Sequence, residues 1–414
     1  MPEIAITGLG VVAPNGTGKE EFWQALKNGV SGIGPVTRFD ASGYPSRVAG
    51  EVKLPLPYFD EQLFERNNKL SLTSELIMTA GFLALQDAGL SRDAFANSSS
   101  GIWVGTTTTD MGLVERDYSS FKEQGKANPF FITSAYPHAS ARSLGAALQC
   151  LGPVTTASIG CSSGLFSIVF AAEAIARGDL EIALAGGGDA PVTPFLYSGF
   201  CEANFLSTSF NQAPHKSCRP FDASRDGGVL SEGVGMIVLE KAETAARSNR
   251  SVYGYLSGWN RSNAYKYELM EEAFFSSMTG AIKKALLYPH EVDYICANAP
   301  GDKYIDTAEV KAVARAFSRH AYNIPVSSIK SAIGNPLAAA GPLQLIASLQ
   351  AMNENFVPPT INLDSPSAGN GMDFVANKGR MARLKNILVN AHEFGGSNIS
   401  LLLRSANCIE RRVW

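Results

Sequence analysis

The sequence lacks paired cysteines, long apolar runs and a strong charge of either sign. Its six cysteines form no CxxC pair and show no metal-ligand spacing, so we expect free thiols in a reducing cytosol. A formal net charge of −3 offers no electrostatic attraction for nucleic acid or for an anionic membrane. No apolar run is long enough to span a bilayer, and the N-terminus enters a strand and a turn directly, without the pattern of a signal peptide. These absences predict a cytoplasmic protein with no membrane span and no nucleic-acid partner.

What the sequence does contain is apolar residues and regular alternation. The chain has 414 residues, of which 45% are hydrophobic, so it can bury a large core as one domain or as two fused halves. Short apolar strands alternate with helical stretches, and the alternation begins again after about residue 250. This pattern predicts an α/β fold with helices packed on sheets, divided into residues 1–250 and 251–414.

One cysteine stands where a nucleophile could stand. The stretch TTASIGCSSGLFSIVFAAEAIARG places Cys161 between a β-prone run that begins at Val154 and an apolar helix that ends before Gly178. Unpaired N–H groups and the positive end of a helix dipole favour the thiolate, so the spacing predicts an unusually acidic thiol. The alternative is that Cys161 is a small core residue.

Further polar residues lie in glycine-rich turns near the C-terminal half. Lys330 and Asn335 share a loop in VSSIKSAIGNPLAAAG, and a lysine between a buried strand and a tight turn is more often paired or functional than solvated. Asp306 and Glu309 lie one turn apart at a predicted helix start. They are candidate catalytic carboxylates, or they complement the helix N-terminus.

Two more segments carry charge beside glycine. In CRPFDASRDGGVLSEGVGMIVLE, four charged residues could form a metal site, but the interleaved arginines favour ion pairs that hold a loop: Asp222, Arg225, Asp226 and Glu232. In NAHEFGGSN, the Gly395–Gly396 turn can point N–H groups inward as oxyanion donors, with His392 and Glu393 beside it.

Taken together, these segments resemble the β-ketoacyl-[acyl carrier protein] synthase family. The resemblance covers nearly the whole chain and rests on AITGLGVVAPNG, TTASIGCSSG, the Cys218–Lys241 segment, PVSSIKSAIGN with AAAG, and FGGSN, in the family's order. It implies a thiolase-like α/β fold of two similar βαβαβ halves in an α-β-α-β-α arrangement. It also implies a dimer across the strand near Val154–Ser158. By resemblance, Cys161 accepts an acyl chain from the phosphopantetheine of an acyl carrier protein, with no bound cofactor and no metal.

The resemblance also marks departures. Active family members carry two histidines, and the matching positions here are Asn298 and Asn335. The acid that usually partners the lysine appears as Gln344, whereas Lys330, Asp306, Glu309 and Phe394 match the family. Condensation decarboxylates a malonyl thioester, and one oxyanion donor is worth about 3–4 kcal/mol in comparable sites. Two asparagines leave no titratable base near pH 7 at these positions, so efficient condensation by this chain alone is not expected.

Three interpretations remain open. The segment GIGPVTRFDASGYPSRVAGEV resembles the ketosynthase and chain-length-factor subunits of type II polyketide systems, which suggests an accessory subunit paired with an active ketosynthase, or a homodimer. Chain-length factors usually lose the cysteine, and this chain keeps it. The second interpretation is an acyltransferase or thioesterase in which Cys161 pairs with His392, oriented by Glu393. The third is a slow ketosynthase that uses both asparagines as donors.

Overall fold

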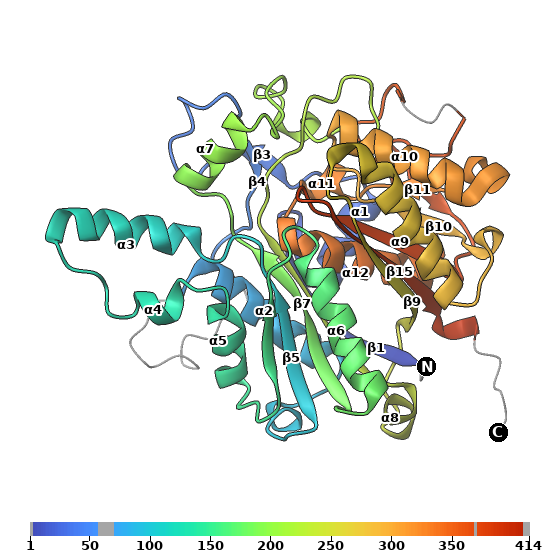
Figure 1. Ribbon diagram of the computed structural model, residues 1–414, viewed down its shortest axis with the longest axis horizontal. Coiled ribbons are helices and arrows are strands. Elements are labelled where there is room, and N and C mark those ends of the chain that lie inside the picture. The colour runs from blue at the N-terminus through green and yellow to red at the C-terminus, as the bar shows by residue number, and fades with distance from the viewer. Residues whose placement is uncertain (1–2, 57–69, 368–370, 409–414) are drawn as a thin grey trace.

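The structure is a computed structural model that describes residues 3–56, 70–367 and 371–408 (Figure 1). Its centre is a mixed sheet built from two sets of five strands. The strands of the first set are β1 (Ile4–Ala13), β8 (Gly233–Lys241), β7 (Ile182–Asp189), β5 (Ser100–Gly105) and β6 (Val154–Ala157). The strands of the second set are β9 (Gly254–Asn263), β15 (Ser397–Ser405), β14 (Asn386–His392), β10 (Tyr294–Cys296) and β11 (Val326–Ser327). The order across the sheet is β11-β10-β14-β15-β9-β1-β8-β7-β5-β6.

The two sets repeat one pairing pattern, although their sequences do not align by eye. In the first set, β1–β8 and β8–β7 are antiparallel, and β7–β5 and β5–β6 are parallel. In the second set, β9–β15 and β15–β14 are antiparallel, and β14–β10 and β10–β11 are parallel. The two sets meet through β1 and β9, which pair over Ile4–Ile6 only. The fold therefore consists of two similar halves.

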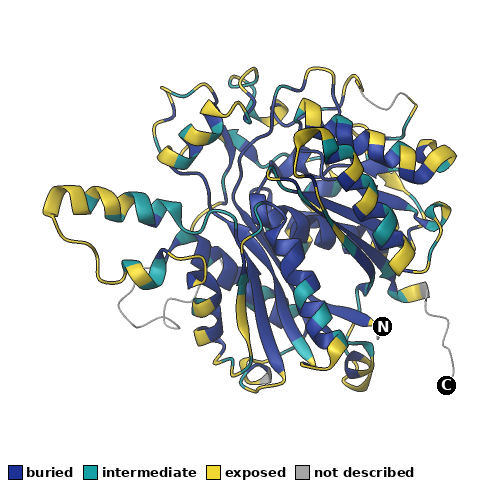
Figure 2. Cartoon of the chain, viewed as in Figure 1, coloured by how far each residue is buried: buried dark blue, intermediate teal, exposed yellow. Residues whose placement is uncertain are grey.

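Helices fill the layers on both sides of these strands. Helix α6 (Ser163–Arg177) packs on β5 and β7, and α12 (Ala340–Glu354) contacts α6 together with β8 and β14, so these two helices form the central layer. Helices α2 (Leu72–Asp87) and α5 (Ala139–Ala147) cover the outer face of the first half. Helices α9 (Met270–Lys284) and α10 (Lys303–Phe317) cover that of the second. This arrangement confirms the expected thiolase-like α/β fold, whose central strands are buried (Figure 2).

The remaining elements lie around this framework. The short helices are α1 (Lys19–Lys27), α4 (Phe131–Ser134), α7 (Pro194–Glu202), α8 (Ala242–Arg247) and α11 (Lys330–Ile333). The short strands are β2 (Gly16–Thr17), β3 (Ile33–Pro35), β4 (Val48–Gly50), β12 (Phe356–Val357) and β13 (Arg380–Met381). Helix α3 (Met111–Gln124) extends away from the body as an arm and is exposed along most of its length (Figures 1 and 2).

The topology explains where the site lies. Because β6 and β11 occupy matching places at the two ends of the sheet, the chain that follows each strand returns toward the central layer. Cys161 lies in the turn between β6 and α6, whereas Lys330 and Asn335 follow β11 and precede α12. Helices α6 and α12 contact each other, so residues from the two halves meet at one place. Within the described residues, no helix is long and apolar enough to cross a membrane.

Candidate active site

Cys161 lies in a tight turn between β6 and α6, as the sequence predicts. Gly160 has a φ of 57°, a left-handed conformation that glycine adopts without strain. The Ser163 hydroxyl donates to the Gly160 carbonyl at 2.6 Å and accepts from the Ile159 N–H at 2.7 Å, which fixes the turn. Helix α6 ends at Gly178, whose φ is 86°. The thiol is thereby held at the start of a buried helix.

The predicted acidity of Cys161 is wrong. Burial raises the pKa of its thiol to about 12, because the thiolate loses its hydration. The charge of Lys330 opposes that rise, and the carboxylates of Glu393 and Asp189 add to it. The residue is only 5% exposed, so the favourable helix N-terminus does not compensate for lost contact with water.

Asn298 is the centre of a polar network that sequence spacing could not describe. Lys330 Nζ donates to Asn298 Oδ1 at 2.8 Å, and the backbone N–H of His392 donates to the same oxygen at 3.1 Å. Two donors on the oxygen turn the amide NH₂ of Asn298 away from both of them. Lys330 is 1% exposed, and burial lowers the pKa of its ammonium group.

The matched carboxylates Asp306 and Glu309 hold backbone beneath this network. Glu309 accepts from the N–H groups of Asn298 and Ala299, both at 2.9 Å, and burial raises its pKa. Asp306 accepts from the Gly301 N–H at 3.2 Å, and burial raises its pKa to about 7. These contacts favour a role in positioning the NAPGD segment, because both carboxylates are fully committed to neighbouring groups.

The side chain of Gln344 also forms hydrogen bonds with the backbone. Its amide NH₂ donates to the carbonyls of Ala297, at 2.8 Å, and Asn390, at 3.0 Å. The side-chain amide of Asn390 in turn donates to Glu309 at 2.9 Å. Gln344 therefore ties α12 to the strands that carry the site, and the hydrogen-bond partner of Lys330 is Asn298.

His392 is oriented by a different residue from the one expected. Its Nδ1 lies 2.9 Å from Asn398 Oδ1, and because that oxygen only accepts, Nδ1 carries the proton. Nε2 is buried and has no hydrogen-bond partner in the part of the chain that the structure describes. Burial lowers the pKa of His392 to about 4, and the ring packs against Phe274. The prediction that Glu393 orients this histidine is wrong, because Asn398 does so.

The carboxylate of Glu393 instead caps its own loop. It accepts from the N–H groups of Gly395 and Ser397. The Gly395 N–H is therefore occupied, which corrects its expected role as an oxyanion donor.

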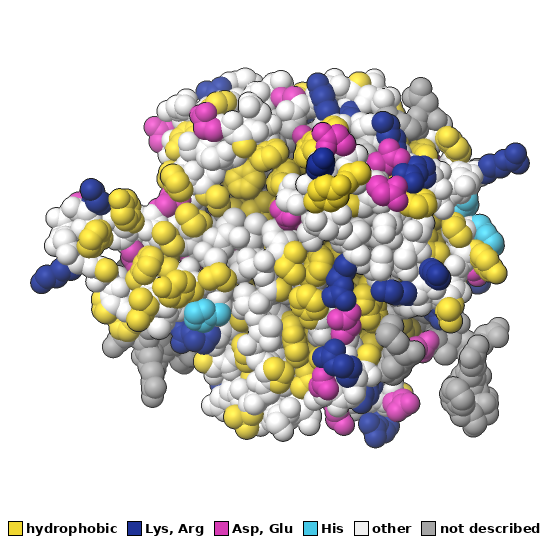
Figure 3. Space-filling view, viewed as in Figure 1, with side chains coloured by type: hydrophobic (Ala, Val, Ile, Leu, Met, Phe, Trp, Pro, Cys, Tyr) yellow, Lys and Arg dark blue, Asp and Glu magenta, His cyan; other side chains and the backbone are white. Residues whose placement is uncertain are grey.

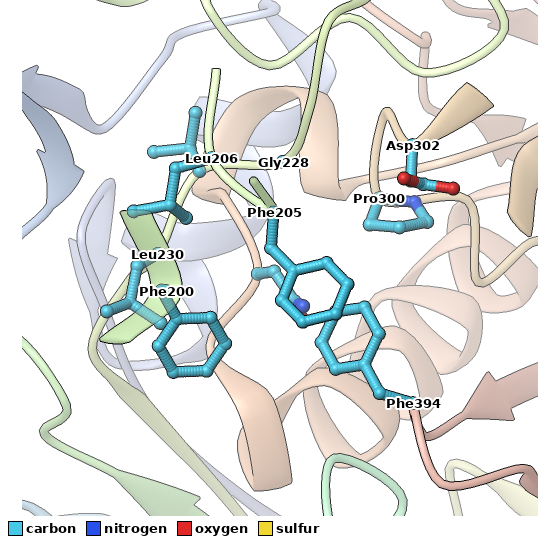
Figure 4. Close-up of a pocket in the computed structure, with 10 residues that line it drawn as sticks. Phe200, Phe205, Leu206, Gly228, Leu230, Pro300, Asp302 and Phe394 are labelled. Atoms are coloured by element: carbon cyan, nitrogen blue, oxygen red, sulfur yellow. The ribbon is translucent and has the colours of Figure 1, made fainter. Parts of the chain in front are cut away.

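Asn335 lines a closed pocket beside this loop (Figure 4). The aromatic rings of Phe205 and Phe394 stack over it with centroids 4.1 Å apart and planes 24° apart. The free space inside is about 10 Å³, roughly what one water molecule requires. Asn335 Oδ1 is buried without a partner among the described residues. The pocket is mostly apolar, and its other lining residues are Phe200, Leu206, Gly228, Val229, Leu230, Pro300 and Asp302.

Asp189 is a site residue that the sequence analysis missed. It is fully buried at the end of β7 and accepts from Thr106 Oγ1 at 2.7 Å and from the Ala338 N–H at 3.0 Å. It thus joins the loop after β5 to the turn after Asn335. A carboxylate directly after GGG at the end of a buried strand is the one signal that could have indicated it; Phe205 and Asn398 carry no such signal.

The charged Cys218–Glu240 segment forms ion pairs, as its arginines indicate. Arg225 lies 3.4 Å from Asp306, and Arg219 lies 3.2 Å from Asp222. Arg38, from outside the segment, pairs with Glu232 at 2.7 Å. Residues 3–56, 70–367 and 371–408 contain no cluster of three or more His, Cys, Asp or Glu side chains that could hold a metal ion.

Comparison with known proteins decides the family. The model of the β-ketoacyl synthase N-terminal domain matches residues 1–245, and that of the C-terminal domain matches residues 253–364. The chain belongs to the β-ketoacyl synthase family. Members of the family act in fatty acid and polyketide biosynthesis on acyl chains carried by the phosphopantetheine of acyl carrier proteins.

The curated relatives of this chain come from both kinds of pathway. A 3-oxoacyl-[acyl-carrier-protein] synthase 2 of Coxiella burnetii is 35% identical and aligns over 97% of this chain and 98% of its own length. The granaticin polyketide putative β-ketoacyl synthase 1 of Streptomyces violaceoruber is 33% identical and aligns over 97% of each chain.

Solved structures give the same result. The ishigamide ketosynthase/chain length factor has a TM-score of 0.88 and 26% identity, and the match covers 98% of this chain and 99% of that one. A type II polyketide ketosynthase in complex with its acyl-carrier protein has a TM-score of 0.89 and 27% identity, over 98% of this chain and 99% of that one.

Proposed function

We propose that this β-ketoacyl synthase is a chain-length-factor-like subunit that pairs with an active ketosynthase in an acyl-carrier-protein-dependent pathway. The observation that carries the proposal is the state of Asn298. This amide replaces a histidine, and its oxygen is already occupied by Lys330 and by the backbone of His392. The position can offer a hydrogen bond but no proton shuttle.

The condition of the cysteine pocket supports an accessory role. Burial raises the pKa of Cys161 to about 12, so only a small fraction is thiolate near pH 7. The neighbouring pocket at Asn335 is closed by Phe205 and Phe394 and has room for about one water molecule. An acyl chain would have to displace both rings before it could occupy that pocket.

An exposed edge and an apolar arm support a partner subunit. Strand β6 ends the sheet, with Val154 39% exposed and the preceding Leu151 74% exposed. Apolar side chains also gather over α3 and α4 at the left of Figure 3. The exposed large apolar residues on and beside these two helices are Tyr118, Phe121, Phe130, Ile132 and Tyr136. A strand edge beside an apolar patch is typical of an interface with another chain.

Co-expression with a ketosynthase that is encoded nearby and that retains the cysteine and both histidines tests this proposal. Native mass spectrometry should detect a one-to-one heterodimer, and this chain expressed alone should form a homodimer. Two independent homodimers after co-expression, with no mixed species, would contradict the pairing.

A second candidate function uses Cys161 directly, as an acyltransferase or thioesterase. The observation in its favour is the unprotonated Nε2 of His392, which is buried and has no partner in the described part of the chain. A free lone pair of this kind could act as a general base. Intact-mass analysis after mixing with acylated carrier proteins tests it. Acyl transfer to Cys161 that is lost in H392F but retained in H290Q, an exposed control, would support it.

The third candidate, a slow ketosynthase, draws on the amide NH₂ of Asn298. Because the amide oxygen faces Lys330 and His392, the NH₂ group is turned elsewhere and could donate to a developing oxyanion. Malonyl decarboxylation by the chain alone, abolished in N298A, would favour this candidate over the other two.

A further inference from the structure

The side chain of Glu393 occupies the space between two glycines beside Cys161. A Cβ on Gly160, the residue before the cysteine, would lie 1.8 Å from Glu393 Cγ and 2.6 Å from its Cδ. A Cβ on Gly395 would lie 2.9 Å from each carboxylate oxygen. Both positions must therefore be glycine for the carboxylate to lie where it does.

The carboxylate is held in place by backbone N–H groups and not by a cation. The carboxylate oxygens accept from the Gly395 N–H and the Ser397 N–H. The backbone N–H of Glu393 donates to the Ser397 carbonyl at 2.9 Å. Among the residues that the structure describes, no lysine, arginine or histidine forms an ion pair with it. Glu393 is partly exposed and its side chain lies against Gly160, so it places a negative charge beside the turn that carries Cys161.

Three charged groups act on the Cys161 thiol, one positive and two negative. Lys330 favours a negative charge there, whereas Glu393 and Asp189 oppose it. Asp189 is fully buried and accepts hydrogen bonds from Thr106 and from the N–H groups of Thr107, Thr108 and Ala338. Lys330 donates to Asn298 and lies in the field of the Asp306 and Glu309 carboxylates. Of the three groups, only Glu393 is partly exposed, so its charge is the one that a group arriving from solvent can meet directly.

We propose that Glu393 is a specificity-determining residue that admits neutral acyl thioesters to Cys161 and disfavours acyl groups that carry a carboxylate, such as malonyl. This inference rests on the part of the proposed function in which Cys161 retains the capacity for acyl transfer. In that step the Cys161 sulfur attacks the thioester carbonyl and a new Sγ–C bond forms. The C–S bond to phosphopantetheine breaks, and the proton given up by Cys161 passes to the departing pantetheine thiol. The carbonyl oxygen carries a transient negative charge in this step whichever thioester reacts, so Glu393 discriminates only against acyl groups that bring a carboxylate of their own.

Two alkylating probes of similar size test the proposal: neutral iodoacetamide and anionic iodoacetate. Their rate constants at Cys161, measured at pH 9.5 by peptide mapping, are compared with those of glutathione under the same conditions. The ratio of the iodoacetamide to the iodoacetate rate constant should be about tenfold larger for Cys161 in the purified full chain than for glutathione. This is the size expected for one carboxylate a few ångströms away in partly screened surroundings.

Two variants separate charge from loop structure. E393Q removes the charge and keeps one oxygen that can accept the short hydrogen bond from the Gly395 N–H, and it gives up only the long one from the Ser397 N–H, at 3.4 Å. Its ratio of iodoacetamide to iodoacetate rate constants should therefore fall to near that of glutathione. D302N is the control, because it removes a carboxylate at another place and asparagine caps α10 equally well. An unchanged ratio in E393Q, an equal change in D302N, or no reaction of Cys161 with either probe would overturn the inference. None of these outcomes depends on the partner subunit, so a failure here is distinct from a failure to form the heterodimer.

Discussion

At the scale of single residues, burial decides the chemistry of Cys161. A thiol at the start of a helix is often acidic, but this one is 5% exposed, and burial raises its pKa to about 12. Position along a helix can be derived from sequence, whereas the loss of water around a side chain depends on what the rest of the fold packs against it.

The reactivity of Cys161 should therefore follow pH without a plateau near neutrality. Below its pKa, the thiolate fraction of a cysteine rises about tenfold per pH unit. We expect the rate of iodoacetamide labelling at Cys161 to rise through pH 7 to 10, and the half-buried Cys150 to react first at pH 8. Peptide mapping by mass spectrometry measures both. A plateau for Cys161 between pH 7 and 8 would show that its thiol is acidic after all.

Restoring both histidines tests whether the asparagines silence condensation. The two positions act on one oxyanion, so the variant N298H/N335H should decarboxylate malonyl carrier protein at least about tenfold faster than either single variant. Release of carbon dioxide is the measurement, with circular dichroism to confirm folding. A folded double variant with no gain would place the block elsewhere, for example in the loop that carries His392 and Glu393.

His392 should make the protein sensitive to acid. Burial lowers the pKa of His392 from 6.5 to about 4. Between these two pH values the unfolded state therefore binds a proton at His392 and the folded state does not. The contribution of neutral His392 to the free energy of unfolding is fully present above pH 6.5. It is lost as the pH falls toward 4, and the loss amounts to up to about 3 kcal/mol.

Urea unfolding of H392F, which keeps an aromatic ring at this position and removes the titratable group, measures this contribution. Between pH 6.5 and 4, the free energy of unfolding should fall less steeply in H392F than in the native chain. Exposed His290 provides the control, and H290Q should behave as the native chain does. Equal slopes in H392F and the native chain would mean that His392 is protonated in the folded state.

At the scale of elements, the sequence was sufficient for the framework but not for the contacts. The apolar helix that the sequence predicts after Cys161, ending before Gly178, is α6, and the helix predicted to start around Asp306 and Glu309 is α10. The pairing of strands far apart in the chain, which makes the two halves equivalent, is not written in local periodicity. Nor are the contacts of Lys330 with Asn298 and of His392 with Asn398, because each joins residues from different elements or turns.

The segment Thr106–Phe121 leads from the site into the arm and gives a prediction of its own. Thr106 is bound to buried Asp189, whereas Phe121 is 44% exposed on α3. We expect replacement of its bulky residues, for example in L113A and F121A, to change the length of the acyl product of the heterodimer by at least one extension unit. Mass spectrometry of released products is the measurement, with Y288A, exposed far along the chain, as the control. Unaltered product length in both variants would mean that this segment does not bound the space that holds the growing acyl chain.

At the scale of the whole molecule, the chain has the fold of its family, and we propose that it acts as an accessory subunit instead of condensing acyl chains alone. Obligate interfaces commonly bury about 2,000–5,000 Å². The strand edge at β6 and the apolar arm of α3 and α4 provide a surface on which a partner could bury such an area. In a heterodimer, the partner's own cysteine would carry the growing chain, and this chain would shape the space around it.

Product formation by the heterodimer with Cys161→Ala is the most direct measurement of this claim. Cys161 is small and buried in an apolar cluster, so alanine should leave the fold intact, which circular dichroism checks. The account predicts turnover within about twofold of the native heterodimer, while the same substitution at the partner's nucleophile abolishes it. Loss of turnover in Cys161→Ala, with the partner's site intact, would contradict the accessory role and make Cys161 the acyl carrier.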